Sequence, residues 1–297
     1  MNITELRVLK YFLAVSKHEN ISRAAKELHL TQPTLSRQIA ELEEELGVDL
    51  LIRGKRRTVL TEAGLLLKVR AEEIVSLTDK TMGQLANIDE IFEGDVYIGC
   101  GETEGMRELV RAIESIHTSY PKIRIHLTSG NDELVTDGLQ KGILDFGLLC
   151  SAREPAEYSY LQIPHKDVWG LYMTKKNMLS KKQNICAKDI AGEPLIVSRQ
   201  ALNAKEFDHW LKKRAEELNI AATYNLVYNA IFLVEHGFGS VLSFKGLIPT
   251  MRENNESIVF RPLFPELLSN NFIVWKKGQV FSHAGQLVLN AFENAFS

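Results

Sequence analysis

The sequence has few cysteines and no long apolar run. Its three cysteines, Cys100, Cys150 and Cys186, are odd in number and form no CxxC motif, which argues for free thiols in a reducing compartment. No segment approaches the ~20 apolar residues of a membrane-spanning helix, and the N-terminus carries neither the basic nor the continuous apolar region of a signal peptide. These absences predict a cytoplasmic protein with no membrane partner.

Motifs of catalysis and metal binding are also missing. The chain contains no GxSxG elbow, P-loop, HExxH or paired Cys/His spacing. His126, within an apolar segment, and His236, before Gly237, are more typical of packing or capping residues than of catalytic bases or metal ligands. We therefore expect a protein that is not an enzyme and that needs no metal or cofactor.

The net charge of −3 shows no overall excess typical of nucleic-acid binding, but the charge is unevenly distributed. Residues 1–60 hold ten Lys and Arg against eight Asp and Glu, a net charge of +2, and four of those ten lie between Arg53 and Arg57. At 297 residues the chain exceeds what one hydrophobic core usually serves, which predicts two or more domains.

Residues 31–46 predict an amphipathic helix. Its apolar edge, which we expect to be buried, follows helical spacing and is formed by Leu35, Ile39, Leu42 and Leu46. Thr31 is a good N-cap, and Pro33 falls in the first turn, where a missing amide proton costs little. The polar first turn on the other face suits a helix that enters the major groove of DNA, although a solvated surface helix has the same pattern.

The flanking segments complete a helix-turn-helix and a hairpin. A first helix is expected over residues 4–17, and Asn20 or Ser22 can cap a second, short helix that packs through Ala24 and Ala25. So short a link to the third helix forces a steep crossing. Gly47 is expected to end the third helix, and residues 49–61 then predict a hairpin with a cationic tip.

The run SRAAKELHLTQPTLSRQIAELEEELGVDLLIRGKRRTVLTEAG closely resembles the winged helix-turn-helix of LysR-type transcriptional regulators. The likeness covers about the first 65 residues, and Leu51 departs from it where the family usually has Phe. It implies a sequence-specific regulator that binds double-stranded DNA as a homodimer or homotetramer, with RNA polymerase as a further candidate partner.

Twelve residues are expected at the DNA. Base edges would be contacted by Gln32, Pro33, Thr34 and Arg37. Phosphates or the helix start would be held by Ser22, Arg23, Thr31 and Ser36. The wing would grip the backbone or the minor groove through Arg53, Lys55, Arg56 and Arg57.

Residues 62–87 predict one long amphipathic helix, which either packs on the rest of the chain or, as the resemblance implies, pairs with its twin in a dimer. Beyond residue 91, short apolar runs alternate with helical patterns, which predicts an α/β fold. The expected strands are 96–100, 123–128, 144–149, 168–174, 195–198, 224–228 and 240–244, with helices at 104–118, 132–141, 204–219, 230–236 and 282–296.

The predicted architecture therefore joins an all-α N-terminal domain to a two-lobed α/β domain that resembles the effector-binding half of the same family. We expect a winged helix-turn-helix at 1–61, a linker helix at 62–90 and an effector-binding domain at 91–297. Chain crossings near Leu161 and Leu267 would divide it into lobe I (91–161 and 267–297) and lobe II (162–266).

Ligands of open α/β sheets bind where strands end and helices begin. This rule and the resemblance predict an effector site, for a small molecule of unknown identity and charge, formed by Gly101, Glu102, Thr103, Thr128, Ser129, Cys150, Ser198, Tyr228, Asn229 and Phe244. For each of these residues, a solvated loop or a capping role is an equal alternative.

Two rival interpretations involve the same loop. Gly99, Gly101 and Gly105 spell GxGxxxG, a variant of the dinucleotide-binding fingerprint, which favours an enzyme or a nucleotide-binding protein. The acidic residue expected at the end of the next strand is missing, and that counts against it. Cys100 and Cys150 both end strands and are candidates for a redox switch, although small buried hydrophobic residues are the commoner explanation.

Overall fold

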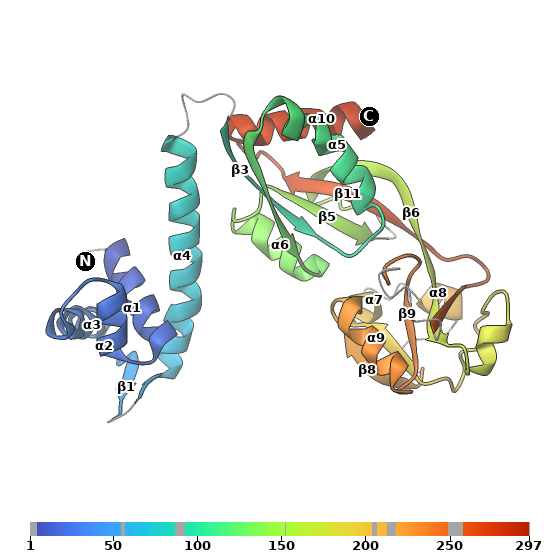
Figure 1. The fold of residues 1–297 in the computed structure, drawn as a ribbon, viewed down its shortest axis with the longest axis horizontal. Coiled ribbons are helices and arrows are strands. Elements are labelled where there is room, and N and C mark those ends of the chain that lie inside the picture. Colours follow the sequence, from blue (N-terminus) through green and yellow to red (C-terminus); the bar gives the residue numbers. More distant parts are fainter. Residues whose placement is uncertain are drawn as a thin grey trace. The chain divides into compact units, whose positions relative to one another are not determined.

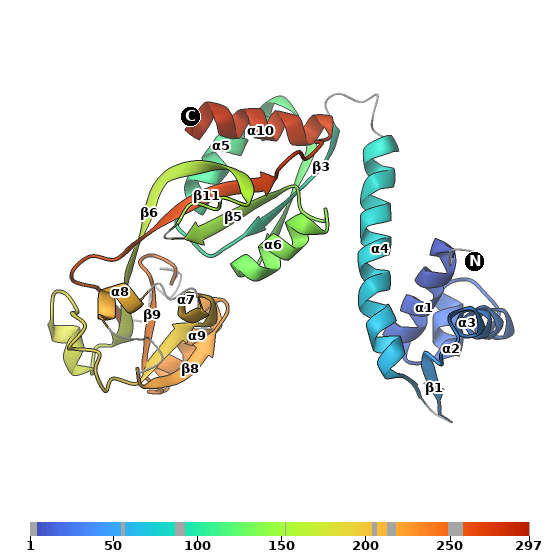
Figure 2. The same cartoon turned by 180° about the vertical axis from the view of Figure 1, so that it is seen from behind.

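The computed structural model describes residues 5–54, 57–86, 93–151, 153–203, 207–212, 218–248 and 258–296. The chain divides into two compact units, Met1–Leu85 and Ala86–Ser297. Figures 1 and 2 show a first unit of helices with a small hairpin and a second unit built on a sheet. Among the described residues, no helix combines the length and hydrophobicity needed to cross a bilayer.

Three short helices open the first unit: α1 (Leu6–His18), α2 (Ile21–Glu27) and α3 (Gln32–Leu46). Asn20 is the cap of α2, because its side chain accepts the Arg23 amide at 3.0 Å. Thr31 caps α3 by accepting the Thr34 amide at 3.4 Å. Gly47 ends α3 with φ 69°, a left-handed conformation that favours glycine. The capped helix expected at 31–46 is confirmed.

Leu35, Ile39 and Leu42 bury the inner edge of α3. They belong to one core with Phe12 of α1, with the two small alanines of α2 and with residues at the base of the hairpin. The prediction for Leu46 was wrong, because its side chain is 42% exposed. Leu46 is the last residue of α3, one turn beyond Leu42, and this core ends before it.

The hairpin, or wing, consists of the antiparallel strands β1 (Leu51–Arg53) and β2 (Thr58–Leu60). Glu43 of α3 fastens it, because one carboxylate oxygen accepts the amides of Leu50 and Leu51 at 2.8 and 3.0 Å. Leu51 is 7% exposed and packs in the core. The long helix α4 (Glu62–Ala86) follows, and an ion pair of 2.8 Å between Lys10 and Asp79 joins it to α1.

Lobe I of the second unit begins with the parallel strand order β4-β3-β5. Its elements are β3 (Glu93–Cys100), α5 (Met106–Ser119), β4 (Lys122–Ser129), α6 (Asp132–Gln140) and β5 (Phe146–Ser151). Helices α5 and α10 (His283–Phe296) cover one face of the sheet, and α6 covers the other (Figure 1). The predicted βαβαβ order is confirmed.

Lobe II repeats this plan with the parallel strand order β9-β7-β8. Its elements are η1 (Met178–Lys181), β7 (Leu195–Ser198), α7 (Arg199–Asn203), α8 (Asp208–Leu211), β8 (Ile220–Tyr224), α9 (Val227–Glu235), β9 (Ser240–Phe244) and β10 (Ile258–Pro262). A buried cluster that includes Leu195, Val197 and Leu242 forms its core.

Two long strands connect the lobes: β6 (Tyr158–Thr174) and β11 (Leu268–Lys276). Strand β6 pairs with β11 from Tyr158 to Val168 and with β9 of lobe II from Trp169 to Tyr172. The change of partner after residue 168 comes later than the crossing expected near Leu161, because β6 runs through both lobes as one strand.

One strand of the sequence analysis was wrong. Residues 224–228 were expected to be extended, but β8 ends at Tyr224 and α9 begins at Val227. The helix is favoured because residues 227, 230, 231 and 234, all buried, follow helical spacing. Of the helix expected over 204–219, the structure shows α8, and residues 204–206 and 213–217 lie outside the described part.

Candidate functional site

The first candidate surface is the start of α3. Thr31, Gln32, Pro33 and Thr34 are all exposed, and the side chain of Arg37 is 81% exposed. Ser36 is half-buried. Ser22 and Arg23 are exposed in the first turn of α2. Helix α3 thus buries its leucine edge and exposes polar groups to solvent. A helix that binds in the major groove requires this arrangement.

The cations of this unit have acidic neighbours. Arg37 pairs with Glu41 at 2.8 Å, Arg53 with Glu43 at 3.0 Å, and Arg57 with Glu19 at 2.5 Å. The Arg57 guanidinium lowers the pKa of the Glu19 carboxyl through this hydrogen bond.

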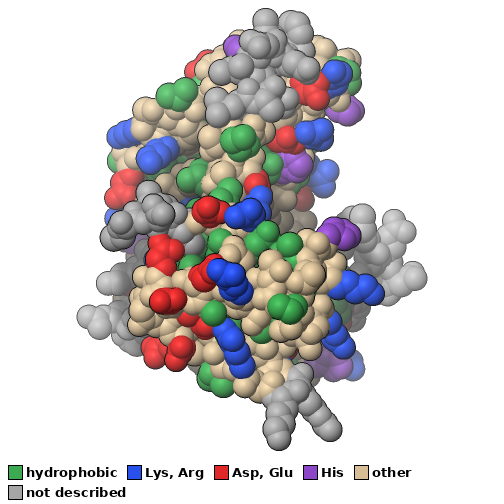
Figure 3. All heavy atoms as spheres, turned by 90° about the vertical axis from the view of Figure 1, so that its left-hand side faces the viewer, with side chains coloured by type: hydrophobic (Ala, Val, Ile, Leu, Met, Phe, Trp, Pro, Cys, Tyr) green, Lys and Arg blue, Asp and Glu red, His purple; other side chains and the backbone are tan. Residues whose placement is uncertain are grey.

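Such exposed ion pairs contribute little to stability, so their guanidinium groups are available to phosphates. On the face drawn in Figure 3, Lys and Arg side chains are interspersed with Asp and Glu. Lys55 and Arg56, also expected at DNA, lie outside the described residues.

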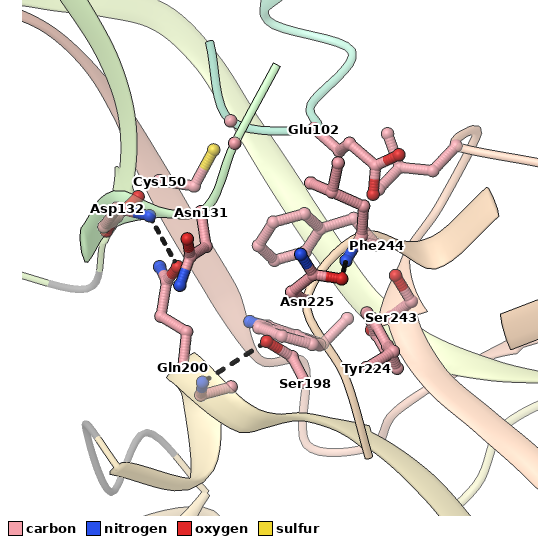
Figure 4. A pocket seen from close by; sticks show the side chains of 16 residues that line it. Glu102, Asn131, Asp132, Cys150, Ser198, Gln200, Tyr224, Asn225, Ser243 and Phe244 are labelled. Atoms are coloured by element: carbon pink, nitrogen blue, oxygen red, sulfur yellow. Dashed lines mark hydrogen bonds between the residues drawn. The ribbon is translucent and has the colours of Figure 1, made fainter. Parts of the chain in front are cut away.

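The second candidate surface is a pocket in the second unit, of about 500 Å³ including part of its open mouth. Figure 4 shows side chains from both lobes around it. Lobe I supplies Gly101, Glu102, Gly130, Asn131, Asp132 and Cys150. Lobe II and β6 supply Trp169, Ser198, Gln200, Ala201, Tyr224, Asn225, Leu226, Ser243, Phe244 and Leu247.

Each lobe caps a helix of the other lobe at this pocket. Glu102, from the loop after β3, accepts a hydrogen bond from the amide of Val227, the first residue of α9. In return, Gln200 of α7 accepts the amide of Asp132, the first residue of α6, at 2.9 Å. Both acceptors satisfy amides that a helix cannot pair internally, so these contacts stabilise the closed arrangement of the lobes.

Burial dominates the electrostatics of the two carboxyl groups in the pocket. It raises the pKa of Asp132 to about 6, against the opposing effect of hydrogen bonds from Gln200 and the Cys150 amide. It also raises the pKa of Glu102, against the opposing effect of the amides at the start of α9. A buried carboxylate without a cationic neighbour is costly, and protonation relieves that cost.

Five of the ten residues predicted for the effector lie in the pocket lining: Gly101, Glu102, Cys150, Ser198 and Phe244. Thr128 and Ser129 do not, because β4 is the edge strand of the sheet and its last residues are exposed. Tyr228 and Asn229 are exposed on α9, where the missed strand end shifts the lining to residues 224–226.

Thr103, also outside the lining, belongs to a buried polar network beneath the pocket. Its hydroxyl donates to Asp167 of β6 at 2.6 Å and accepts the Gly105 amide at 2.8 Å. Asn271 of β11 donates to the same Asp167 oxygen at 2.9 Å and is contacted by the Cys150 thiol at 3.3 Å. Through Cys150, this network links the pocket lining to both connecting strands, β6 and β11.

The sequence analysis missed several lining residues, of which Asp132, Gln200 and Trp169 have the most distinctive chemistry. Asp132 and Gln200 each lie in the first turn of a helix that follows a strand. They come three residues after Ser129 and two residues after Ser198, which the strand-end rule had suggested. Trp169 carried no such signal, because it lies within the connecting strand β6.

The glycines of the GxGxxxG loop have packing roles. A Cβ atom on Gly99 would lie 2.6 Å from Leu144 and 3.0 Å from Val135, and one on Gly105 would lie 2.9 Å from Asn271. Close side-chain packing explains both residues, so neither is evidence for a pyrophosphate site.

The thiols give no support to a redox switch. Burial raises the pKa of Cys100 to about 12, which leaves it protonated and unreactive. Among the described residues, no group of three His, Cys, Asp or Glu side chains is arranged to hold a metal ion.

Comparison with known proteins matches one family model to each unit. Residues 6–65 match the model of the bacterial regulatory helix-turn-helix protein, lysR family, and residues 90–297 match that of the LysR substrate binding domain. The chain belongs to the LysR family. Its two units correspond to the two parts of such regulators, and the α/β fold class is confirmed.

Individual relatives support the same assignment. A hydrogen peroxide-inducible genes activator of Pectobacterium carotovorum subsp. carotovorum is 31% identical over 193 residues, which cover 65% of this LysR-family chain and 63% of that protein. The uncharacterized HTH-type transcriptional regulator YvbU of Bacillus subtilis (strain 168) is 27% identical, with 90% and 89% covered. The chain thus aligns with less than two thirds of the peroxide activator's length.

The fold extends to a solved complex. The crystal structure of full-length CbnR with its target DNA has a TM-score of 0.74 and 22% identity, with 98% of each chain covered. At this identity the likeness establishes the shared fold.

Proposed function

We propose that this protein is a sequence-specific transcriptional regulator that binds double-stranded DNA through α3 and the wing, and that responds to a small molecule bound between the lobes. The observation that carries the proposal is the two-sided character of α3, whose leucine edge is buried while Gln32 and Arg37 are exposed. A relative of the same fold was solved with its target DNA, which supports this use of the fold.

Base contacts are assigned to Gln32, Pro33, Thr34 and Arg37, with Ser22, Arg23, Thr31, Ser36 and the wing cations Arg53, Lys55, Arg56 and Arg57 at the backbone. Base contacts discriminate between sequences, and phosphate contacts supply affinity that falls with salt. The protein acts in the cytoplasm, where the bacterial chromosome and its candidate partner RNA polymerase are found.

Helix α4 supports a homodimer or homotetramer. Six large apolar side chains are between 44% and 64% exposed along it: Leu65, Leu66, Val69, Ile74, Leu77 and Met82. Apolar side chains exposed in this number are costly in water unless another apolar surface covers them. A second copy of α4 supplies such a surface, and the resulting twofold symmetry suits a near-palindromic DNA site.

Each segment of the chain is assigned one function: residues 1–61 bind DNA, residues 62–90 pair with a second copy, and residues 91–297 bind the effector. The effector must favour one arrangement of the subunits over another, because equal binding to both changes nothing. The interlobe pocket supports this role, since it draws residues from both lobes and Trp169 from the connecting strand β6.

The test is selection of DNA from a random pool, followed by footprinting of the selected sequence. We expect a near-palindrome with half-sites an integral number of turns, multiples of ~10.5 base pairs, apart. Arg111→Ala, which removes an arginine that is 69% exposed from an ion pair on α5, is the control for arginine variants of the first unit and retains site binding. Binding that is independent of sequence would overturn the regulator proposal in favour of a general DNA-packaging role.

A further inference from the structure

The charge of the pocket lining has one sign. Glu102 and Asp132 line it, and none of the lining residues in the described part of the chain is a lysine, arginine or histidine. The other polar groups are neutral amides and hydroxyls, among them Asn131, Gln200 and Ser243 (Figure 4). Within a partly buried cavity, the repulsion of a ligand anion by two carboxylates is screened less than at the surface.

The first amides of the helices that face the pocket are also bonded. Helix N-termini bind anions through amides that have no partner within the helix. Here the first amide of α9 is bonded to Glu102 and the first amide of α6 is bonded to Gln200, each from the opposite lobe. An anionic ligand would have to displace a contact that holds the lobes together.

Aromatic faces complete the lining. Trp169 and Phe244 are 4% and 7% exposed, with ring centroids 4.2 Å apart, and Tyr224 also lines the pocket. Aromatic faces attract a cation and also pack against the apolar part of an amphipathic ligand.

We infer that the effector is a small organic cation, a primary amine or guanidine joined to an apolar or aromatic group, whose charged nitrogen is held by Asp132 and whose apolar part lies beside the rings of Trp169 and Phe244, while Glu102 adds to the negative charge of the same lining. This inference rests on the proposed function, since it names the ligand class of the same pocket. The raised pKa of both carboxyl groups agrees with a pocket that has no countercharge of its own.

The test compares three ligands of similar size and different charge: phenethylamine, 2-phenylethanol and 3-phenylpropanoate. Binding to the full chain is followed by tryptophan fluorescence and calorimetry at neutral pH. We expect the amine to bind at least tenfold more tightly than the alcohol, and the carboxylate to bind most weakly. A wider set of aliphatic and aromatic amines, with their alcohol and carboxylate counterparts, extends the comparison to ligands of other shapes.

Two variants locate the charge. Asp132→Asn should weaken amine binding about tenfold while alcohol binding changes little, because only the charged ligand loses a charge-assisted hydrogen bond. Glu133→Gln removes the same charge from the neighbouring exposed position outside the lining and should leave amine binding unchanged.

The outcomes separate the two proposals. Preference for carboxylates over amines, or an equal response of the Asp132 and Glu133 variants, overturns the cation assignment and leaves the regulator with an effector of another class. If no ligand of any charge binds, the pocket is not a ligand site, and both the effector half of the proposed function and this inference fail.

Discussion

Glu102 and Val227 connect the two lobes of the effector domain through one hydrogen bond, from the Val227 amide to the Glu102 carboxylate. The two residues are far apart in the chain, and they meet because α9 begins where the loop after β3 ends. The bond from the Asp132 amide to Gln200 is a second link of the same kind. The two hydrogen bonds together hold the lobes on either side of the pocket.

Removal of the Glu102 carboxylate should loosen this closure. In Glu102→Ala the amide of Val227 loses its acceptor, so we expect its hydrogen exchange to become severalfold faster or more. Exchange followed by mass spectrometry at residues 226–230 measures this. Glu108→Ala, on α5 away from the pocket lining, is the control. Unchanged protection of Val227 would show that the interlobe contact does not hold the lobes together.

Asp132 should make stability depend on pH in the direction opposite to most carboxylates. Its pKa of about 6 in the fold lies above the ordinary value of 3.8, so the folded state binds the proton more tightly than the unfolded state does. The free energy of unfolding therefore falls as pH rises from about 4 to about 6.

Asp132→Asn removes this penalty. We expect a gain on the order of 2 kcal/mol in the free energy of unfolding at pH 7 and almost none at pH 4. Urea denaturation at the two pH values measures the difference, with Glu133→Gln as the charge-matched control. A variant that is equally stable or less stable at pH 7 would contradict the assigned cause of the shift.

Arg37 and Arg57 should differ in their effects on DNA. Arg37→Ala, at the start of α3, is expected to reduce the preference for the selected site by about tenfold or more, because a base contact is lost. Arg57→Ala, in the wing, should weaken selected and random DNA equally and reduce the salt dependence. Titrations of both DNAs at two salt concentrations decide the matter, and an equal loss of preference in both variants would refute these roles.

Glu43 should be essential for the wing. Glu43→Ala leaves the amides of Leu50 and Leu51 without their acceptor and frees Arg53, so we expect the first unit to lose about 1–3 kcal/mol of stability. Glu44→Ala removes a neighbouring exposed carboxylate and should cost much less. Thermal unfolding of the full chain compares the two variants, and equal losses would show that Glu43 carries no special role.

The exposed apolar side chains of α4 should control the oligomeric state. Val69→Glu places a charge on a side chain that is 51% exposed, where it would be buried in a dimer but tolerated in a monomer. We expect smaller particles by light scattering and weaker binding to the complete DNA site. Glu72→Gln, on the same helix, should keep the wild-type mass. Unchanged mass in Val69→Glu would move the dimer contact to another surface.

Local patterns were sufficient for much of this fold. The cap at Thr31, the end of α3 at Gly47 and the long helix α4 depend on interactions within a few residues, so spacing and residue type predicted them, and the same reasoning narrowed the cap of α2 to Asn20 or Ser22. The strand prediction at 224–228 was wrong because an apolar run of that length is compatible with a strand or a helix. The helix is favoured because its apolar side chains are buried against the sheet of lobe II.

The candidate pocket was predictable only in part for a related reason. Gly101 and Glu102 directly follow β3, and Cys150 and Ser198 are among the last residues of β5 and β7, so the sequence alone marks these positions. Whether a given side chain then turns into the pocket, as Ser198 does, or into the buried network, as Thr103 does, depends on neighbours contributed by β6 and β11.

The sequence by itself determined the helix-turn-helix, the wing and the alternation of strands and helices, because these follow from short-range spacing and capping. Only the tertiary structure decided that Glu102 and Gln200 cap helices of opposite lobes and that the pocket gathers carboxylates and aromatic rings without a lining cation among the described residues. Those relationships join residues remote in the chain, and their position is fixed by the packing of the lobes around the connecting strands.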